Sequence, residues 1–415
     1  MKVGVIGLGY VGLPLALAFA EEGHDVVGLD ADSRKIDSLR ASESYIEDVP
    51  SESLAAVAER LAATTHYEDL GECDAVIICV PTPLTQSREP DLTHLIDSAN
   101  SLAKVLKRGQ LVSLESTTYP GTTRERLRPI LEESGLAAGR DFHLAFSPER
   151  IDPGRTDYTV RTTPKVVGGL TDECTERAAA LYGEICDEVV RVSGPEPAEL
   201  TKLLENIFRS VNIALVNELA MLCERLEIDI WEVIDAASPK PFGFMRFEPG
   251  PGMGGHCLPV DPFYLSYKAR EHDFYTEFIE LAGKTNQNQP AWCVQRIERA
   301  LNEVAKPVNG SNVLLMGVSY KAGVGDIRES PALKIIGLVR ELNGEVSYHD
   351  PYVPELRAHD LKSVDPAEAV GAADIVCIVT AHPEFDFERI VSEAALVLDF
   401  RGVTRGIEAN NLVRL

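Results

Sequence analysis

Short apolar runs alternate with helical patterns over the first 195 residues of the chain. Stretches with helical spacing, beginning with residues 12–22, separate the runs. Such alternation is typical of βαβ units, so we expect a parallel sheet. The runs that predict its strands are KVGVIGLG (2–9), HDVVGLD (24–30), DAVIICV (74–80), LVSLES (111–116) and FHLAFS (142–147). Two later runs predict an extension of the sheet, PKVVGG (164–169) and EVVRVS (188–193).

The pattern becomes helical near Pro195. Apolar residues recur at helical spacing in 196–237, a loop rich in Pro and Gly follows, and further helix extends to about residue 304. Alternation then returns, with strands predicted at 312–319, 345–350, 373–380 and 395–402. The predicted fold class is α/β, with two Rossmann-like parallel-sheet domains joined by a central helical bridge. We expect domains at 1–195, 196–305 and 306–415.

Composition narrows the class of protein. The chain has 415 residues, of which 45% are hydrophobic, yet it contains no apolar run of about 18 residues that would predict a membrane span. Its formal charge of −25 argues against a nucleic-acid partner. The acidic balance fits either adaptation to high salt or an ordinary acidic enzyme. We expect a cytoplasmic protein with no membrane partner.

The eight cysteines are scattered, and no two of them have CxxC spacing. A zinc site is therefore not expected, and we predict that the protein holds no metal. Several cysteines lie inside apolar runs, where they are expected to behave as small core residues. A protein of this size in the cytoplasm has little need of a disulfide framework.

The motif GLGYVG at residues 7–12 follows the first predicted strand and opens a helix. Its glycines suit a tight turn, close approach to a pyrophosphate, and strand–helix packing. Asp30 ends the next strand, where a carboxylate accepts ribose hydroxyls and repels a 2′-phosphate, which favours NAD over NADP. Arg34 lies close enough to weaken that preference. The dinucleotide contacts are expected from Gly7, Gly9, Tyr10, Val11 and Gly12.

The second α/β region lacks a GxGxxG motif, and MGVSYKAGVGDIRES (316–330) follows its first strand instead. Lys321 and Arg328 are cations near a strand end, where open α/β sheets bind ligands. Two such domains suggest two nucleotide ligands. The alternative interpretation is that Lys321 and Arg328 are ordinary surface cations.

Cys257 lies in the loop GPGMGGHCLPVDPF (250–263), directly after His256. Three interpretations are open: a buried structural thiol, a metal ligand, or a nucleophile. A structural thiol fits poorly in a loop so rich in Gly and Pro, and a metal pair with His256 lacks further ligands at the usual spacing. Neighbouring cations would favour a reactive thiolate.

Seven motifs occur in an order that resembles the UDP-glucose/GDP-mannose dehydrogenase family over nearly the whole chain. The forms SPER..PG and GGHC resemble the branch that acts on UDP-N-acetylhexosamines. The resemblance implies a four-electron oxidation in which the sugar C6 alcohol becomes a carboxylate and two NAD are reduced without a metal. The motifs are GVIGLGYVGLPLA, VPTP, LESTTYPGTT, FSPERIDPG, ELTKLLENIFRSVNIALVNELA, GPGMGGHCLPVDPFYL and GVSYKAGVGDIRESPA.

The resemblance also implies the catalytic residues. Cys257 matches the nucleophile, which would form a thiohemiacetal and then a thioester. Lys202 and Asn206 are four apart on a predicted helix and so share one face. They match an oxyanion-stabilising pair of the family. Without the resemblance, they would be interpreted as a solvated lysine and an asparagine in helix packing. Glu149 matches the general base for thioester hydrolysis.

Two further matches concern water and proton transfer. Asp261 matches an aspartate that holds a water or relays protons near the reacting carbon. Thr117 in LESTTYPGTT matches a threonine in the same water network. A surface carboxylate is the default interpretation of any single aspartate.

Substrate phosphates and uracil need hydrogen-bond donors and room. We expect Arg150, Arg246, Gly254 and Lys321 to bind the substrate. Arg328 matches an arginine that reaches NAD, and Thr82 of VPTP is also expected at the cofactor. The final strand departs from the usual Asp-x-Arg-Asn pattern, because LDFRGVT has glycine in the place of the asparagine.

The predicted activity is the oxidation of UDP-GlcNAc or UDP-ManNAc at C6, by a homodimer or higher homo-oligomer formed through the central helices. A UDP-glucose 6-dehydrogenase is the nearest alternative. A non-catalytic nucleotide-sugar binding protein and a two-electron hydroxyacid dehydrogenase are alternatives from other classes.

Overall fold

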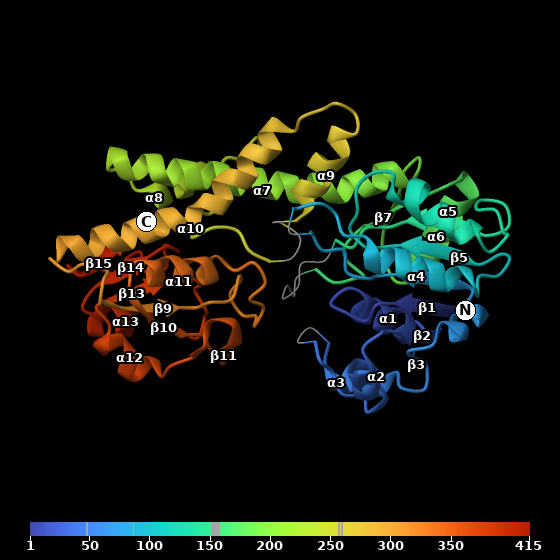
Figure 1. The fold of residues 1–415 in the computed structure, drawn as a ribbon, viewed down its shortest axis with the longest axis horizontal. Helices are drawn as coiled ribbons and strands as arrows, with labels where there is room; N and C mark the ends of the chain where they lie inside the picture. Colours follow the sequence, from blue (N-terminus) through green and yellow to red (C-terminus); the bar gives the residue numbers. More distant parts are fainter. Residues whose placement is uncertain (47–48, 86, 151–157, 256–257, 259) are drawn as a thin grey trace. The chain divides into compact units, whose positions relative to one another are not determined.

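The computed structural model describes residues 1–415 except 47–48, 86, 151–157, 256–257 and 259. The chain divides into two compact units (Figure 1). The first comprises Met1–Glu205 and Phe263–Tyr275, and the second comprises Asn206–Pro262 and Thr276–Leu415. Each unit contains a sheet rich in parallel strands. The long helix α7 (Pro195–Leu226) contains the boundary between the two units, so that its first residues belong to the first unit and the rest to the second. The predicted α/β fold class is confirmed, while the division into three domains stays a prediction.

The first unit is built on an eight-stranded sheet with the order β3-β2-β1-β4-β5-β6-β7-β8. Three of the five early runs form strands in which every residue is buried, β4, β5 and β6, as expected when helices cover both faces of a sheet. The strands are β1 (Lys2–Ile6), β2 (Asp25–Leu29), β3 (Leu61–Thr64), β4 (Ala75–Ile78), β5 (Leu111–Leu114), β6 (His143–Phe146), β7 (Lys165–Gly169) and β8 (Val189–Arg191).

One pair in this sheet departs from the parallel prediction, because β6 and β7 are antiparallel. Parallel neighbours need a crossover connection, which is usually a helix. No helix occurs in residues 147–150 and 158–164, the described part of this connection. The chain therefore turns back on itself, and β7 brings its amino end to the edge where β1 to β6 bring their carboxyl ends.

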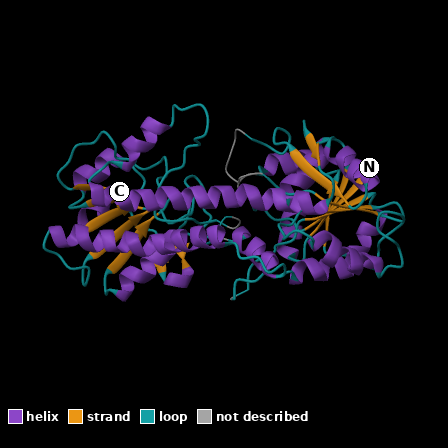
Figure 2. Cartoon of the chain, turned by 90° about the horizontal axis from the view of Figure 1, so that it is seen from above, coloured by secondary structure: helices purple, strands orange, loops and turns teal. Residues whose placement is uncertain are grey.

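Helices flank the first sheet, as Figure 2 shows in purple around the orange strands. Phe19 on α1 and Tyr182 on α6 are fully buried against the strands and anchor the main hydrophobic core. The helices are α1 (Gly12–Glu21), α2 (Ser33–Arg40), α3 (Ser51–Ala56), α4 (Thr93–Ala103), α5 (Arg128–Glu132), α6 (Asp172–Tyr182) and α9 (Asp261–Arg270), with a 3-10 helix at Tyr67–Glu72 and a π-helix at Thr122–Leu127.

The second unit contains a five-stranded, wholly parallel sheet with the order β10-β9-β13-β14-β15. Its strands are β9 (Asn312–Met316), β10 (Glu345–His349), β13 (Ile375–Ile378), β14 (Val397–Asp399) and β15 (Leu412–Arg414), and a small antiparallel pair is formed by β11 (Glu355–Leu356) and β12 (Leu361–Lys362). The helices are α8 (Ile230–Ala237), α10 (Glu277–Glu303), α11 (Pro331–Glu341), α12 (Pro366–Ala372) and α13 (Phe387–Glu393). The edge strands β3 and β15 were not predicted, because they are short and only partly buried.

The helix α7 is long, with 32 residues. From Asn206 onward it exposes a row of apolar side chains, which are Phe208, Leu215, Leu219, Leu222 and Leu226. Throughout the described part of the chain, however, no helix combines the length and the hydropathy that a membrane span requires.

Candidate active site

The loop between β1 and α1 has the backbone that a dinucleotide requires. Gly7 adopts a φ of +91°, and a Cβ there would lie 2.7 Å from the carbonyl oxygen of Cys79. A Cβ on Gly12 would lie 1.9 Å from the carbonyl oxygen of Gly7, so that strand and helix can meet only without a side chain. A Cβ on Gly9 would meet nothing within 4 Å. This open backbone at a helix N-terminus fits the pyrophosphate of NAD.

Asp30 stands at the end of β2, where its carboxylate is held in place by three donors. Its Oδ2 accepts from the Leu8 backbone N–H at 2.9 Å and from Lys35 Nζ at 2.8 Å, and its Oδ1 accepts from the Asp32 N–H at 2.9 Å. A carboxylate oxygen has two lone pairs, so Oδ1 retains capacity for a ribose hydroxyl. The contact between Lys35 and Asp30 was not predicted, although the position of Lys35 in the first turn of α2 could have suggested it.

Arg34, which we expected to weaken the preference for NAD, pairs with Asp32 rather than with Asp30. Its Nη2 lies 2.8 Å from Asp32 Oδ2, and its side chain is 90% exposed. The hydrogen bonds from Arg34 lower the pKa of Asp32 to about 2. Two aspartates therefore stand near the expected ribose position, and both favour a cofactor without a 2′-phosphate.

The loops after β4 and β5 are tied together by hydrogen bonds. Thr82 Oγ1 donates to the carbonyl oxygen of Thr117 at 2.7 Å, and the buried Tyr264 of α9 donates to the carbonyl oxygen of Thr82 at 2.6 Å. Thr118 is 1% exposed, and its hydroxyl has no partner among the described residues. A buried hydroxyl without a partner is unfavourable, so Thr118 has bonding capacity left for a water or a ligand. The sequence had singled out its neighbour Thr117, which is only half-buried.

Glu149 follows β6 and lies in a cluster of buried charges. Lys165 Nζ lies 3.3 Å from Glu149 Oε2 and 2.8 Å from Glu115 Oε2. Burial opposes the charge on Lys165, but the attraction of Glu115 and Glu149 outweighs it and raises the pKa of Lys165. The ammonium group therefore stays charged. Neither Lys165 nor Glu115 was predicted, since within the runs PKVVGG and LVSLES they looked like ordinary strand ends.

Arg150, a predicted substrate contact, is engaged within the first unit. Its Nη2 and Nε bind the two carboxylate oxygens of Glu205 at 2.6 and 3.2 Å, and its Nη1 donates to the carbonyl oxygen of Pro164 at 2.6 Å. Its role in substrate binding stays a prediction.

Helix α7 carries Lys202 and, one turn later, Asn206, and both are buried. One turn before Lys202, the fully buried Glu199 accepts from the N–H of Gly121 at 2.6 Å and from the N–H and Oγ1 of Thr123 at 2.8 and 2.7 Å. Burial raises the pKa of Glu199 to about 7. This carboxylate holds the TYPGTT loop against the start of α7.

Asn206 and Asp261 are brought together in the second unit, where the side-chain amide of Asn206 donates to the carboxylate of Asp261. Asn206 is 5% exposed and Asp261 is 2% exposed. Asp261 is also the first residue of α9. The structure thus joins two predicted catalytic residues that are 55 positions apart in the sequence.

The predicted nucleophile Cys257 and its neighbour His256 lie outside the described residues. The glycines before them pack closely on Tyr320. A Cβ on Gly254 would lie 2.7 Å from Tyr320 Cβ, and a Cβ on Gly255 would lie 3.0 Å from Cε2 of the Tyr320 ring. The Gly255 N–H donates to the carbonyl oxygen of Arg328 at 2.9 Å. Tyr320 therefore approaches both glycines, and Glu329 and Pro331 also approach Gly254.

Two predicted cations of the second unit form ion pairs. Arg328 Nη2 lies 2.6 Å from Asp326 Oδ2, and Arg246 Nη1 lies 2.6 Å from Asp235 Oδ1. The loop that carries Lys321 is fixed by Ser319, whose hydroxyl donates to the Lys321 carbonyl oxygen at 2.8 Å. The ligand contacts expected of these three cations stay predictions.

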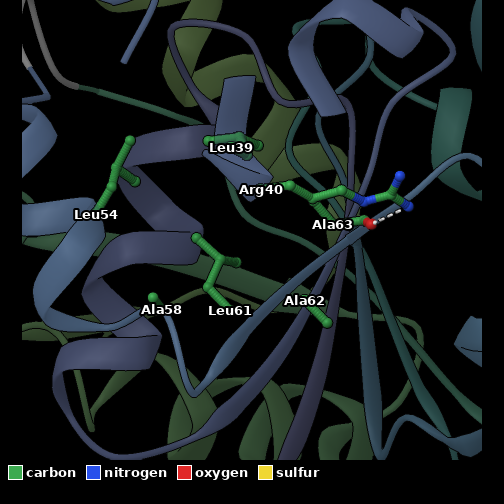
Figure 3. A pocket seen from close by; sticks show the side chains of 7 residues that line it. All are labelled: Leu39, Arg40, Leu54, Ala58, Leu61, Ala62 and Ala63. Carbon is green, nitrogen blue, oxygen red and sulfur yellow. Dashed lines mark hydrogen bonds between the residues drawn. The ribbon is translucent and has the colours of Figure 1, made fainter. Parts of the chain in front are cut away.

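A pocket of about 320 Å³ lies away from all these residues, at the outer edge of the first sheet (Figure 3). Arg40 donates to the carbonyl oxygen of Ala63 at 3.1 Å beside it. The pocket is lined mainly by alanine and leucine, and none of the predicted site residues lines it. The lining residues are Leu39, Arg40, Leu54, Ala58, Leu61, Ala62 and Ala63.

Three family models match consecutive parts of the chain. Residues 1–186 match the NAD binding domain of the UDP-glucose/GDP-mannose dehydrogenase family. Residues 196–288 match its central domain, and residues 314–406 match its UDP binding domain.

Known proteins resemble the chain over nearly its full length. It is 39% identical over 389 residues to a UDP-N-acetyl-D-glucosamine 6-dehydrogenase of Pseudomonas aeruginosa, covering 93% of this chain and 91% of that protein. It is 36% identical over 427 residues to a UDP-N-acetyl-D-mannosamine dehydrogenase of Pyrococcus horikoshii, covering 98% and 100%. A solved UDP-D-ManNAc dehydrogenase from Pyrococcus horikoshii superposes with a TM-score of 0.92 at 33% identity, covering 100% and 99%. The chain therefore belongs to the UDP-glucose/GDP-mannose dehydrogenase family and is an NAD-dependent oxidoreductase.

Proposed function

We propose that this enzyme oxidises the C6 alcohol of a UDP-N-acetylhexosamine, UDP-GlcNAc or UDP-ManNAc, to the uronic acid in a four-electron reaction. The observation that carries the proposal is the full-length similarity to enzymes named for these two sugars. The buried pair of Asn206 and Asp261 supports it, because Asp261 follows Cys257 closely in the sequence.

The first oxidation converts the alcohol to an aldehyde. The Gly7–Gly12 loop and Asp30 would hold NAD, which would supply the hydride acceptor for each of the two oxidations. Asp261 takes up the proton of the C6 hydroxyl, directly or through a water, and Asn206 orients its carboxylate. The Asn206 amide has a second N–H, which together with the Lys202 ammonium stabilises the developing oxyanion.

The second oxidation requires a tetrahedral centre at C6. The Cys257 thiolate adds to the aldehyde carbon and forms a thiohemiacetal, whose oxidation leaves a thioester. Water then cleaves the thioester with Glu149 as general base. The acid is released and the thiolate is restored.

The enzyme acts as a homodimer or a higher homo-oligomer formed through the central helices. The exposed apolar residues of α7 support this part of the proposal, because positions 208, 215, 219, 222 and 226 recur every three, four or seven residues and so form one stripe. A stripe of this kind is usually covered by another apolar surface. The cytoplasmic location stays a prediction.

NADH formation with a panel of UDP-sugars tests the substrate, and mass spectrometry of the product tests the outcome. We expect two NADH per sugar and a uronic acid from UDP-GlcNAc or UDP-ManNAc. Turnover of UDP-glucose alone would support the UDP-glucose alternative. A Cys257→Ser variant should form no acid, whereas a two-electron hydroxyacid dehydrogenase would tolerate the change, and a binding protein would show no turnover at all.

A further inference from the structure

Lys165 is the first residue of β7, the strand that runs against β6. The ladder pairs Ala145 with Gly169 and Phe146 with Gly168. Extended three residues beyond the end of the ladder, this register would place position 149 opposite position 165, in agreement with the ion pair between Lys165 and Glu149. Because β7 is antiparallel, a lysine at its amino end reaches the same sheet edge as a glutamate beyond the carboxyl end of β6.

The ammonium group of Lys165 is anchored on its far side. Glu115 follows β5, is completely buried, and lies 2.8 Å from Lys165 Nζ. The ring of Tyr182 adds a cation–π contact at 5.2 Å from the nitrogen. The side chain of Lys165 is itself 6% exposed. Glu115 and Tyr182 therefore leave the cation little freedom to move.

Glu149 is the outer member of this cluster. Its side chain is 14% exposed, whereas that of Glu115 is 0% exposed. Its Oε2 binds Lys165 at 3.3 Å, and its Oε1 accepts the Arg150 N–H at 2.7 Å.

We propose that Lys165, anchored by Glu115, is a positioning residue that holds Glu149 in place for hydrolysis of the Cys257 thioester. This role rests on the proposed function. Lys165 places a positive charge beside both Glu149 and Glu115 in a poorly solvated region, and a nearby opposite charge favours the ionised form of a carboxylate. Lys165 thereby keeps Glu149 both ionised and oriented.

In the hydrolysis step, Glu149 takes one proton from a water while the water oxygen bonds to the thioester carbonyl carbon. The carbon–sulfur bond then breaks, and its electron pair stays on Cys257 as the thiolate. The product is the carboxylic acid, which releases its proton at neutral pH. No oxidation occurs in this step, so Lys165 affects hydrolysis and not the two earlier oxidations.

Pre-steady-state kinetics separate these stages. The variant K165M/E115Q removes the cation together with the carboxylate that it neutralises, which avoids leaving a buried unpaired charge. With NAD and the UDP-sugar that the wild type oxidises, it should give a normal burst of NADH, and its steady-state rate should then fall about 10- to 100-fold. The quenched variant should carry the mass of a sugar acyl group on Cys257. K165R, which keeps the charge, should recover part of the steady-state rate.

Lys268 provides a matched control. It is also buried, lies 2.7 Å from Glu125 and 2.8 Å from Glu271, and lies 5.6 Å above the ring of Tyr119. K268M should leave the ratio of burst to steady-state rate unchanged. The proposed role is overturned if folded K165M/E115Q hydrolyses at the wild-type rate, or if its burst and its steady-state rate fall together. A wild type that makes no acid from any UDP-sugar overturns the proposed function and this role with it.

Discussion

The side-chain amide of Asn206 on α7 donates a hydrogen bond to the carboxylate of Asp261, the first residue of α9, and both residues are buried. A buried carboxylate without a donor is unfavourable in its ionised form. Asn206 therefore supplies a donor to this buried carboxylate and orients it.

Asn206→Ala should lower kcat about 100-fold, because it removes both the donor to Asp261 and an oxyanion contact. Asn206→Asp should lower kcat at least as much, since two adjacent buried carboxylates cannot both stay ionised. Steady-state formation of NADH measures the effect. Asn302→Ala, an exposed position on α10, should behave like the wild type. A fully active N206A enzyme would contradict the role of the pair.

Gly9 and Gly12 should respond differently to alanine. A Cβ at Gly9 meets open space, so Gly9→Ala should fold normally and weaken NAD binding by about tenfold or more, because the methyl group occupies the pyrophosphate position. Gly12→Ala should destabilise the first unit, since its Cβ would lie 1.9 Å from the Gly7 oxygen. Calorimetric titration with NAD and thermal unfolding check the two outcomes.

Gly337→Ala on α11 is the control for that pair, because its Cβ also meets nothing within 4 Å. It should change neither NAD affinity nor the stability of the first unit. Unchanged NAD affinity in Gly9→Ala would argue that the loop does not hold the pyrophosphate.

Glu199 should make stability depend on pH. Burial raises its folded-state pKa from 4.5 to about 7, so the folded state binds more protons than the unfolded state between these values. Its contribution to the free energy of unfolding is fully present below about pH 4.5 and is lost as the pH rises through about 7. The loss between pH 5 and pH 8 is on the order of 2 kcal/mol.

Glu199→Gln should therefore show a shallower decline in stability from pH 5 to pH 8 than the wild type, as measured by denaturant unfolding at both values. Glu188→Gln, at an exposed position, should keep the wild-type slope. Equal slopes for the wild type and E199Q would show that Glu199 does not titrate in this range.

Leu219→Glu on α7 should weaken self-association. Leu219 is 41% exposed and lies in the middle of the apolar stripe, so a charge there would be buried by a partner helix. Light scattering after gel filtration should show a shift toward monomer at micromolar concentration. Leu342→Glu, which is 36% exposed and lies outside α7, should leave the oligomer intact. A wild type that is monomeric would contradict the proposal.

The fold class and the family follow from the amino-acid sequence alone. Buried strands that are covered on both faces appear as continuous apolar runs, and helices appear with their own spacing, so both sheets and α7 were predicted from local pattern. The Gly7–Gly12 loop was also predictable, because the steric demands of that turn select glycine. The ordered motifs indicated the family that the comparisons confirmed.

Which charged and polar side chains meet depends instead on how the chain folds in three dimensions. The antiparallel β7 brings Lys165 to Glu149, α7 brings Asn206 to Asp261, and Arg150 pairs with Glu205. These partners lie between 16 and 55 positions apart, and their meeting depends on strand direction and helix placement. Local patterns report which face of an element is buried. They carry no information about the direction in which a distant strand returns, and that direction places Lys165 beside Glu149.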